Sequence, residues 1–476
     1  MITIECDSIH CVINNKLDIA KLRSFEELKY KKVWWKQGQY KKQKKEYKLS
    51  IVDKNGVFYT GLLKRVEKCL IERVLKYEVK TNFDCTECVK PELEGITFRE
   101  DQEQALNNLI ESGRGVWQAP TGAGKTILLC GLIAAYNNSM TLIIVHTEAL
   151  FNQTYDELTK FFGASETIGR IGCGHKYKDE GVVVAMIQTL SRSKQQMGFW
   201  NNWEQVIVDE VHHVAYGGTY EKVLSKLYAP IRFGFTATPS EERERRLAME
   251  GLLGPVVGKT TYKELQDKDV LAKPRVKVFW TPETNLLDRI EELKKKWAIE
   301  DAGSKRKRRV DYKTAYEMGI VNNRKRNELI IEKSFGLIAR GLTVLIVVER
   351  VEHGEILLAL AEKEKKEMFV FLHGNTPSEE REQEKKIFKQ KKRRGVIATR
   401  IWSEGTNIQT IGAVVNAVGG LSEIACLQRF GRGMRTAEGK KEVILVDFMD
   451  SNHYFFQKHS MKRLCLYFEQ GWIGSD

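Results

Sequence analysis

Proline is scarce in this chain: its 8 prolines and 37 glycines among 476 residues are too few for a collagen-like or proline-rich protein. Long apolar runs are also missing. The longest stretch without a charged residue, Thr126–Thr147, is interrupted by the polar residues 137–139, so it predicts a helix and a strand. A membrane-spanning helix would need about 20 apolar residues. Glu5 and Asp7 stand where a signal peptide needs apolar side chains, so we expect neither secretion nor a membrane partner.

The cysteines do not form a recognisable framework. Nine of them, an odd and scattered set, fit a reducing cytoplasm better than a disulfide-rich secreted domain. Cys85 and Cys88 have the spacing of half a zinc site and Cys69 is a candidate third ligand, but no fourth ligand stands at a usual distance. We therefore expect no zinc, and a cytoplasmic protein, which would mean the host cytoplasm if a phage encodes it.

Acidic residues are outnumbered, with 63 Asp and Glu against 77 Lys and Arg, a net charge of +14. Residues 1–80 alone hold 16 Lys and 3 Arg against 10 acids, and between residues 29 and 48 the lysines alternate with Tyr and Trp. Cations neutralise phosphates and aromatic rings stack on bases. The alternative is a solvated lysine face over an aromatic core. We predict that DNA is contacted here by Lys31, Lys32, Trp34, Trp35, Lys41 and Lys42.

The pattern of apolar segments divides the chain. Residues 1–90 predict a small basic α+β module, with an Asn-Gly hairpin turn at residues 53–56. From about residue 97, apolar strands of a few residues alternate with helices in two successive series, as in parallel sheets. We therefore predict an α/β protein with two tandem parallel-sheet lobes, at residues 91–272 and 273–450. A helical tail, residues 451–476, is expected to pack on the second lobe.

One segment has the strand–loop–helix context of a phosphate-binding loop. It reads Ala119, Pro120, Thr121, Gly122, Ala123, Gly124, Lys125 and Thr126. The glycines let backbone N–H groups point at anionic oxygens, and the helix N-terminus favours negative charge. We predict that this loop binds ATP, that Lys125 reaches the β- and γ-phosphates and that the Thr126 hydroxyl binds Mg²⁺. Ala119 replaces the glycine usual at the first position.

Two adjacent carboxylates, Asp209 and Glu210, close the apolar strand Val206–Val208. Acids at this position of a nucleotide-binding fold divide their roles: Asp209 would hold Mg²⁺ through its water shell, and Glu210 would orient and deprotonate the attacking water. An exposed Asp-Glu turn is the alternative interpretation. The phosphate loop upstream favours the catalytic one.

With these two motifs, the sequence resembles the superfamily 2 nucleic-acid helicases over about residues 97–450. Phe98–Gln102 resembles the adenine-reading element, in which Gln102 binds the base edge and Arg99 supports it. Asp209–His212 resembles a DExH box. The resemblance implies two RecA-like lobes and an ATP-hydrolysing enzyme.

Further segments of the first lobe resemble motifs of the same family. Val145–Leu150, with His146, and Gln188–Leu190, with Thr189, resemble elements that contact the nucleic-acid strand. Thr236–Pro239 resembles the element that couples hydrolysis to movement. The resemblance implies that this coupling uses His212, Thr236 and Thr238.

The second series contains two more motifs in the family's order. The first, at residues 398–407, resembles the element that touches both nucleic acid and ATP, which implies roles for Thr399 and Arg400 on DNA, Glu404 in coupling and Gly405 on ATP. The second matches the arginine pattern Q-R-x-G-R-x-x-R at residues 428–435. Gln428, Arg432 and Arg435 would act there in catalysis, because arginines supplied from the opposite lobe stabilise the γ-phosphoryl by about 10³–10⁵ in rate.

The basic N-terminal module, the compact length and a linker near residues 322–327 are similar to phage branch-migration helicases of the UvsW type. This resemblance implies an enzyme that remodels forked or branched DNA in replication, recombination or repair and that works as a monomer. Two other functions stay open at this point. One is an ATP-gated clamp or annealing protein that does not translocate, and the other is an RNA helicase.

Overall fold

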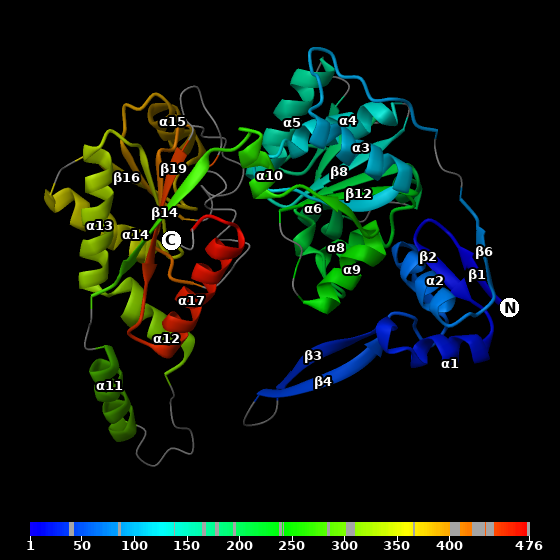
Figure 1. The fold of residues 1–476 in the computed structure, drawn as a ribbon, viewed down its shortest axis with the longest axis horizontal. Helices are drawn as coiled ribbons and strands as arrows, with labels where there is room; N and C mark the ends of the chain where they lie inside the picture. Colours follow the sequence, from blue (N-terminus) through cyan, green and yellow to red (C-terminus); the bar gives the residue numbers. More distant parts are fainter. Residues whose placement is uncertain are drawn as a thin grey trace. The chain divides into compact units, whose positions relative to one another are not determined.

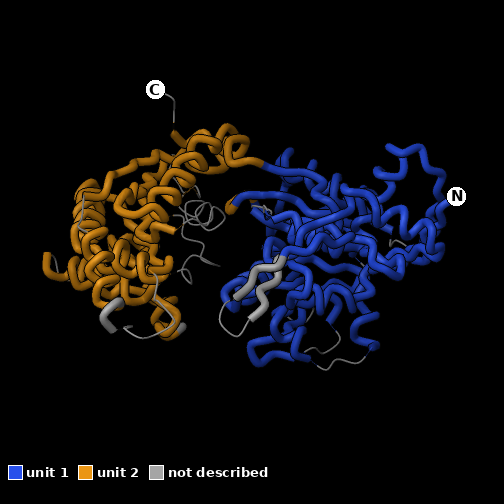
Figure 2. The backbone as a smooth tube through the Cα atoms, turned by 90° about the horizontal axis from the view of Figure 1, so that it is seen from below, with its two compact units in different colours: residues 1–120, 124–260 blue, residues 121–123, 261–476 orange. Residues whose placement is uncertain are grey.

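The fold comes from a computed structural model, which describes residues 1–37, 42–83, 87–137, 139–163, 168–176, 180–193, 197–237, 240, 242–282, 286–300, 310–364, 367–399, 410–420, 434 and 442–473, with the backbone alone at 33–37, 42–45, 298–300 and 378. Residues 1–120 and 124–260 form one compact unit, and residues 121–123 and 261–476 form a second (Figure 2). Within the described residues, no helix is both long and apolar enough to cross a bilayer.

The first 81 residues fold into a small α+β module. A four-stranded sheet has the order β5-β2-β1-β6, and a separate two-stranded hairpin, β3–β4, projects from the module as a long arm (Figure 1). The bounds are β1 (Ile2–Cys6), β2 (His10–Ile13), α1 (Lys16–Ser24), β3 (Lys29–Gln37), β4 (Lys42–Ser50), β5 (Val57–Tyr59), α2 (Leu63–Glu72) and β6 (Tyr77–Thr81). Cys6 and Cys11 face each other across β1 and β2 and are joined by a disulfide.

The predicted Asn-Gly hairpin is wrong in its pairing. A turn does form, because the backbone N–H of Asp53 donates to the Val57 carbonyl at 2.9 Å and Gly56 adopts a positive φ of 83°. The strands on its two sides, however, belong to different sheets: β4 pairs with β3, and β5 pairs with β2. The turn therefore redirects the chain from the hairpin arm back to the module.

The module is built into the first unit through helix α9 (Arg243–Leu253). A Cβ at Gly61 would lie 2.0 Å from the Glu250 carbonyl oxygen, so the two backbones touch. The Arg65 guanidinium binds both oxygens of the Glu250 carboxylate, at 3.0 and 2.6 Å. Leu247 is buried in the module's own hydrophobic core.

Tyrosines line the same junction. The Tyr59 hydroxyl donates to Glu221 Oε1 at 2.7 Å, and Tyr216 lies with its ring centroid 5.4 Å from that of Tyr30 and 6.2 Å from that of Tyr59. Burial raises the pKa of Tyr30 to about 12, so its hydroxyl stays neutral at physiological pH. Packing, hydrogen bonds and ion pairs thus fix the module to the lobe.

The first lobe contains a seven-stranded sheet in the order β13-β7-β12-β11-β8-β10-β9, with parallel pairing throughout. Helices α3, α4 and α5 cover one face, and α6, α8 and α9 cover the other (Figure 1). The further bounds are α3 (Glu100–Ser112), β7 (Arg114–Gln118), α4 (Lys125–Ala135), β8 (Thr141–Val145), α5 (Glu148–Phe162), β9 (Ile168–Ile171), β10 (Val182–Met186), α6 (Ile187–Arg192), α7 (Met197–Asn201), β11 (Gln205–Asp209), α8 (Thr219–Leu224), β12 (Ile231–Thr236) and β13 (Val256–Lys259).

The second lobe contains a six-stranded parallel sheet in the order β14-β19-β18-β15-β17-β16. Its bounds are α10 (Tyr262–Asp267), β14 (Lys273–Trp280), α11 (Leu286–Glu300), α12 (Tyr312–Tyr316), α13 (Arg324–Ala339), β15 (Val344–Val347), α14 (Val351–Glu364), β16 (Phe369–Leu372), α15 (Ser378–Lys389), β17 (Gly395–Ala398), β18 (Ala413–Asn416), β19 (Glu442–Met449) and α17 (Tyr454–Glu469). The predicted fold class, two tandem RecA-like lobes with a small N-terminal α+β domain, is confirmed.

The predicted linker at residues 322–327 is wrong. The Asn323 side chain caps helix α13 by accepting from the Arg326 N–H at 3.2 Å, and Arg326 is fully buried. The predicted domain boundaries stay predictions. The chain divides into its two units after Thr260, which leaves α10 with the second lobe.

Candidate active site

The candidate site lies along the carboxyl edge of the first lobe's sheet. Strands β7, β12, β11 and β8 are consecutive neighbours in that sheet. The phosphate loop follows β7, Thr236 ends β12, the two acids end β11, and His146 follows β8. In parallel α/β sheets this edge is where ligands bind, so the topology gathers motifs that are about 120 residues apart in the sequence.

The phosphate loop has the backbone that its glycines predict. Gly122 and Gly124 have φ values of 91° and 88°, a region that costs glycine little. Gly124 caps helix α4, and Lys125 is the first residue of that helix. A Cβ at Gly124 would lie 2.4 Å from Gln102 Nε2, so glycine is needed here for space as well as for conformation. The loop and the helix N-terminus together suit an anion.

Gln102 and Arg99, the predicted adenine-reading residues, lie next to this loop. Gln102 is 2% exposed, and its Oε1 accepts from the Arg99 backbone N–H at 3.1 Å. Asp101, which the sequence reasoning missed, binds the Arg99 guanidinium through two hydrogen bonds of 3.0 Å. Its position two residues after Arg99, within the same motif, is the sequence signal that could have identified it. The role of Gln102 and Arg99 on the adenine base stays a prediction.

A chain of polar contacts links the loop to the DExH segment. Lys125 Nζ lies 3.3 Å from Glu210 Oε1, and His212 Nδ1 lies 3.3 Å from Glu210 Oε2. The same His212 nitrogen is 3.3 Å from the hydroxyl of Thr236, which is fully buried. The structure therefore brings together the predicted catalytic Lys125 and Glu210 with the predicted coupling residues His212 and Thr236.

Glu210 occupies a left-handed backbone conformation, with φ 55° and ψ 52°. This conformation costs a residue other than glycine about 1–2 kcal/mol. Its backbone N–H donates to Asp209 Oδ1 at 2.9 Å, which holds the turn in place. Strained residues of this kind are concentrated at functional sites.

The two neighbouring carboxylates have opposite pKa shifts. Burial alone would raise the pKa of Glu210, but the Lys125 ammonium and the His212 ring beside it outweigh burial and hold that pKa well below its usual range. Burial raises the pKa of Asp209, and the Lys125 charge offsets only part of this. Glu210 is therefore ionised at neutral pH, as a group that accepts a proton or a hydrogen bond from water must be.

The same edge has the donors that a nucleotide and its metal require. The loop N–H groups and Lys125 suit phosphate oxygens, and the Thr126 hydroxyl and Asp209 carboxylate are oxygen ligands of the kind that Mg²⁺ prefers. Cys85 lies outside the described residues, and among those that are described no three His, Cys, Asp or Glu side chains form a metal-binding group.

The first-lobe residues predicted to contact the nucleic-acid strand lie beside this series of polar contacts. The Gln188 side chain donates to the His146 carbonyl at 2.8 Å, which joins the two predicted motifs. His213, which the sequence reasoning did not single out, has its ring centroid 4.3 Å from that of His146 and 4.2 Å from that of His212. Thr189 lies in the first turn of α6 and is half-buried. The His212, His213 and His146 rings thus lie next to one another between the acid site and these motifs.

Several predicted residues lie outside the described part of the chain. They are Lys41, Thr238, Arg400, Glu404, Gly405, Gln428, Arg432 and Arg435. Thr399 is described and directly follows β17, where its backbone N–H donates to the Leu372 carbonyl at 3.1 Å. Its role on DNA stays a prediction.

The hairpin arm brings its lysines together by register. Lys31 lies directly opposite Lys48, and both side chains are exposed on one face of the ribbon, where Lys48 forms an ion pair with Glu26. The neighbouring Lys32 points to the other face, because side chains alternate along a strand, and its Nζ lies 3.3 Å from Glu244 Oε1 of α9. Lys32 thus helps to dock the arm. For Trp34, Trp35 and Lys42 the structure gives only the strand backbone.

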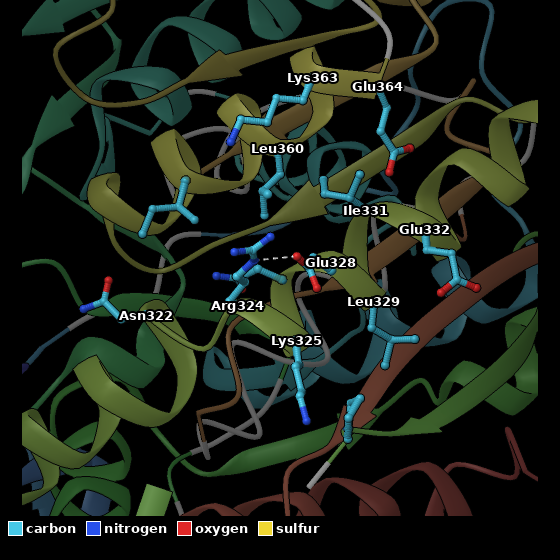
Figure 3. A pocket seen from close by; sticks show the side chains of 13 residues that line it. Asn322, Arg324, Lys325, Glu328, Leu329, Ile331, Glu332, Leu360, Lys363 and Glu364 are labelled. Atoms are coloured by element: carbon cyan, nitrogen blue, oxygen red, sulfur yellow. Dashed lines mark hydrogen bonds and ion pairs between the residues drawn. The ribbon is translucent and has the colours of Figure 1, made fainter. Parts of the chain in front are cut away.

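A pocket of about 800 Å³ lies in the second unit between α13 and α14 (Figure 3). Its lining mixes cations and carboxylates, and Arg324 Nε donates to Glu328 Oε1 at 2.7 Å, one turn further along α13. Because the charges largely compensate each other, this pocket does not present the concentrated positive charge that a phosphate site needs.

Comparisons with known families agree with this geometry. The family model described as "Type III restriction enzyme, res subunit" matches residues 95–241, which hold the whole first-lobe site, and "Helicase conserved C-terminal domain" matches residues 325–437.

Over the aligned residues, two curated relatives are about a quarter identical to this chain. "Putative DNA 3'-5' helicase Rad25" of Haloarcula marismortui is 26% identical over 354 residues, which cover 74% of this chain but only 52% of that protein. "ATP-dependent DNA helicase uvsW" of Enterobacteria phage T4 is 23% identical over 362 residues, 74% of this chain and 68% of the relative. The chain thus spans about half the length of the first of these relatives.

Among solved structures, S. cerevisiae Dbp5 bound to RNA and ADP BeF3 matches with a TM-score of 0.52 and 16% identity, covering 79% of this chain and 88% of that one. At this identity the likeness concerns the fold alone. The two family models, the ordered motifs and the acid site at the phosphate loop lead to one conclusion: the chain belongs to the superfamily 2 helicases of the DExH type.

Proposed function

We propose that the protein is an ATP-dependent DNA helicase or translocase that remodels branched DNA, moving forks or junctions and unwinding or annealing their strands. The observation that carries the proposal is the contact chain Lys125–Glu210–His212–Thr236 at the carboxyl edge of the first lobe. It joins a phosphate-binding lysine to a carboxylate base and then to the segment that follows β12.

The residues of this edge account for hydrolysis and for its coupling. When ATP and Mg²⁺ bind, they supply a phosphoanhydride and a cation that neutralises its charge. Lys125 then exchanges Glu210 for phosphate oxygens, and the released carboxylate orients the attacking water. Because His212 contacts both Glu210 and Thr236, a change at the carboxylate reaches the end of β12. Arg432 and Arg435 complete the proposed catalytic set.

DNA is the proposed substrate for two reasons. The arm places exposed lysines opposite each other, and such charges bind a phosphate backbone irrespective of sequence. The two relatives compared above are named as DNA helicases. We propose branched DNA in particular because the basic N-terminal module would add a second DNA-contact surface to the surface of the lobes.

The deciding experiment measures ATP hydrolysis with a four-way junction, a fork, single-stranded DNA, duplex DNA or RNA as the activator. The proposal predicts the largest stimulation by the junction or fork, and its loss in Lys125→Ala. Stimulation by RNA alone would identify an RNA helicase.

Translocation needs a separate assay. A motor displaces a third strand from a triplex only while ATP is hydrolysed, whereas an ATP-gated clamp changes its DNA affinity without displacement. Equal retention of the triplex with ATP and with a non-hydrolysable analogue would refute translocation.

A further inference from the structure

The segment that follows the DExH box places a tyrosine against the N-terminal module. Tyr216 stands six residues after Glu210 and four after His212, in the loop between β11 and α8. Its ring lies stacked between two tyrosines of the module, 5.4 Å from the Tyr30 centroid and 6.2 Å from that of Tyr59. Tyr30 belongs to β3 of the hairpin arm, and Tyr59 belongs to β5 of the module's sheet. One side chain of this segment therefore contacts both parts of the module.

Tyr216 packs against two hydrophobic cores. One is the core of the first lobe, which includes Val211 and Val214, two buried residues of the same segment. The other is the core of the module. Because tightly packed interiors transmit strain, the position of the Tyr216 ring depends on the module as well as on the lobe.

A glutamate of α8 holds this loop and the module together. One oxygen of the Glu221 carboxylate accepts from the Gly217 backbone N–H, and the other accepts from the Tyr59 hydroxyl at 2.7 Å. Gly217 directly follows Tyr216 and has a φ of 74°, which costs glycine little. Hydrogen bonds to a charged group are about twice as strong as neutral ones. The backbone next to Tyr216 is thus tied to the module through one carboxylate.

On the arm, the residue next to this contact is a lysine proposed to bind DNA. Tyr30 and Lys31 are neighbours in β3, and side chains alternate along a strand, so they point to opposite faces of the ribbon. Lys31 is exposed, whereas Lys32, on the same face as Tyr30, pairs with Glu244 of α9 at 3.3 Å. A phosphate bound by Lys31 therefore lies one residue along the strand from the ring that contacts Tyr216.

At its other end, the same segment carries the strained carboxylate. Glu210 has a left-handed backbone, which persists only where the surrounding structure maintains it. The His213 backbone N–H donates to the Glu210 carbonyl at 3.2 Å, within the short helical turn Val211–His213. The Val214 N–H donates in turn to the Val211 carbonyl at 3.0 Å. Through this short, hydrogen-bonded segment, a restraint on Tyr216 also restrains the backbone of Glu210.

We propose that Tyr216 is a positioning residue through which DNA bound by the hairpin arm acts on Glu210. This inference rests on the proposed DNA-dependent ATP hydrolysis and adds the residue that connects the DNA-binding module to the carboxylate. DNA that holds the arm in place keeps Tyr30 against Tyr216, and Tyr216 keeps the turn at Glu210 in the geometry for hydrolysis. A module that only raised the affinity for DNA would not change the stimulation at saturating DNA.

The test compares variants of the full-length protein at saturating concentrations of a four-way junction. Tyr216→Ala removes the ring, and Tyr216→Phe keeps it without the hydroxyl. Tyr77→Ala is the matched control, because Tyr77 packs against the same module core from β6, at the opposite edge of the sheet from Tyr59. For each variant one measures kcat with and without DNA, KM for ATP, the affinity for the junction, and thermal stability.

The proposal predicts that Tyr216→Ala lowers the ratio of kcat with DNA to kcat without DNA at least about fivefold, the lower end of common coupling between two sites. KM for ATP and the affinity for the junction should change little. Tyr216→Phe should keep most of the stimulation, and Tyr77→Ala should keep it even with a lower melting temperature.

Tyr30→Ala tests the same contact from the side of the arm, and it decides the question if Tyr216→Ala does not fold. It should lower the same ratio, and the two changes together should lower it no further than one alone, because they remove one shared contact. An unchanged ratio in the folded variants, full additivity between them, or an equal fall in Tyr77→Ala overturns the inference. Lys125→Ala tests the proposed function separately, since it removes hydrolysis with and without DNA, so the two failures are distinguishable.

Discussion

The ammonium of Lys125 lies 3.3 Å from the Glu210 carboxylate, so the lysine proposed to bind phosphate and the proposed base form an ion pair with each other. Both side chains are largely shielded, at 16% and 14% exposure, which strengthens their attraction. On the proposed mechanism, a nucleotide therefore competes with Glu210 for Lys125, and the carboxylate becomes available to water only when phosphate takes its place.

Glu210→Gln tests that competition. The change removes the base, so DNA-stimulated hydrolysis should fall by at least about 10²-fold, the lower end of what a general base contributes. It also removes the charge that competes for Lys125, so ATP should bind several-fold more tightly. Nucleotide titration and steady-state ATPase measure the two effects.

The control for this variant is Glu103→Gln, an exposed glutamate on α3 that should leave both quantities unchanged. Weaker ATP binding by Glu210→Gln, at retained thermal stability, would contradict the competition.

His212→Ala should separate hydrolysis from movement. His212 contacts Glu210 and Thr236, but it is not the base. We expect residual DNA-stimulated ATPase, within about tenfold of wild type, together with loss of triplex displacement. A proportional loss of both activities would show that His212 serves hydrolysis alone.

The ion pair between Arg65 and Glu250 should hold the N-terminal module on α9. It is bidentate and partly buried, so Glu250→Ala should lower the free energy of unfolding by about 1–2 kcal/mol, because hydrogen bonds to charged groups contribute about that much. Limited proteolysis should then cut the junction near residues 84–97 faster. Glu264→Ala, on α10 in the other unit, should not change this cleavage.

Lysines of the hairpin arm should set the salt dependence of DNA binding. Each phosphate contact contributes about 0.9 to the slope of log Kd against log salt concentration. Lys31→Ala combined with Lys48→Ala should therefore reduce the slope by about 1 to 2, while the basal ATPase stays unchanged. Lys76→Ala, exposed elsewhere on the module, is the control. An unchanged slope in the double variant would remove the arm from the DNA interface.

His353 should make the second lobe sensitive to acid. Burial, together with the nearby Arg326 charge, lowers its pKa to about 3, and His353 Nε2 lies 2.9 Å from Asn327 Oδ1. The unfolded chain binds this proton near pH 6.5, so the stability contribution is complete above that pH and is lost as the pH falls toward 3.

Urea unfolding at pH 7 and pH 5 measures this loss, which is at most about 1.4 kcal/mol per pH unit for one proton. His353→Gln should reduce the difference between the two pH values. An equally steep loss in the variant would assign the acid sensitivity to other groups.

The sequence predicted most of the sheet strands because parallel, fully buried strands are short apolar runs. It missed β9 and β13, which lie at the two edges of the first lobe's sheet and include glycine and a charged residue. It also missed β3, whose lysines hide the alternation of a strand. The hairpin predicted across Asp53–Gly56 was wrong because the turn residues determine a local bend of the chain but not which strand each neighbouring strand pairs with.

The site was predictable where residues are adjacent in a motif. Lys125 and Glu210 were both identified, yet their 3.3 Å contact depends on β7 and β11 sharing one sheet edge, which no local pattern encodes. The contact of Tyr216 with Tyr59 was not predictable at all, because a tyrosine after the DExH box carries no sequence signal for a partner about 160 residues away.

The central claim is that ATP hydrolysis at Lys125 and Glu210 drives movement on DNA, and triplex displacement measures this most directly. The account predicts that the wild-type protein displaces the third strand with ATP, and that Lys125→Ala and Glu210→Gln, folded and able to bind DNA, do not. Displacement by either variant at the wild-type rate would contradict it.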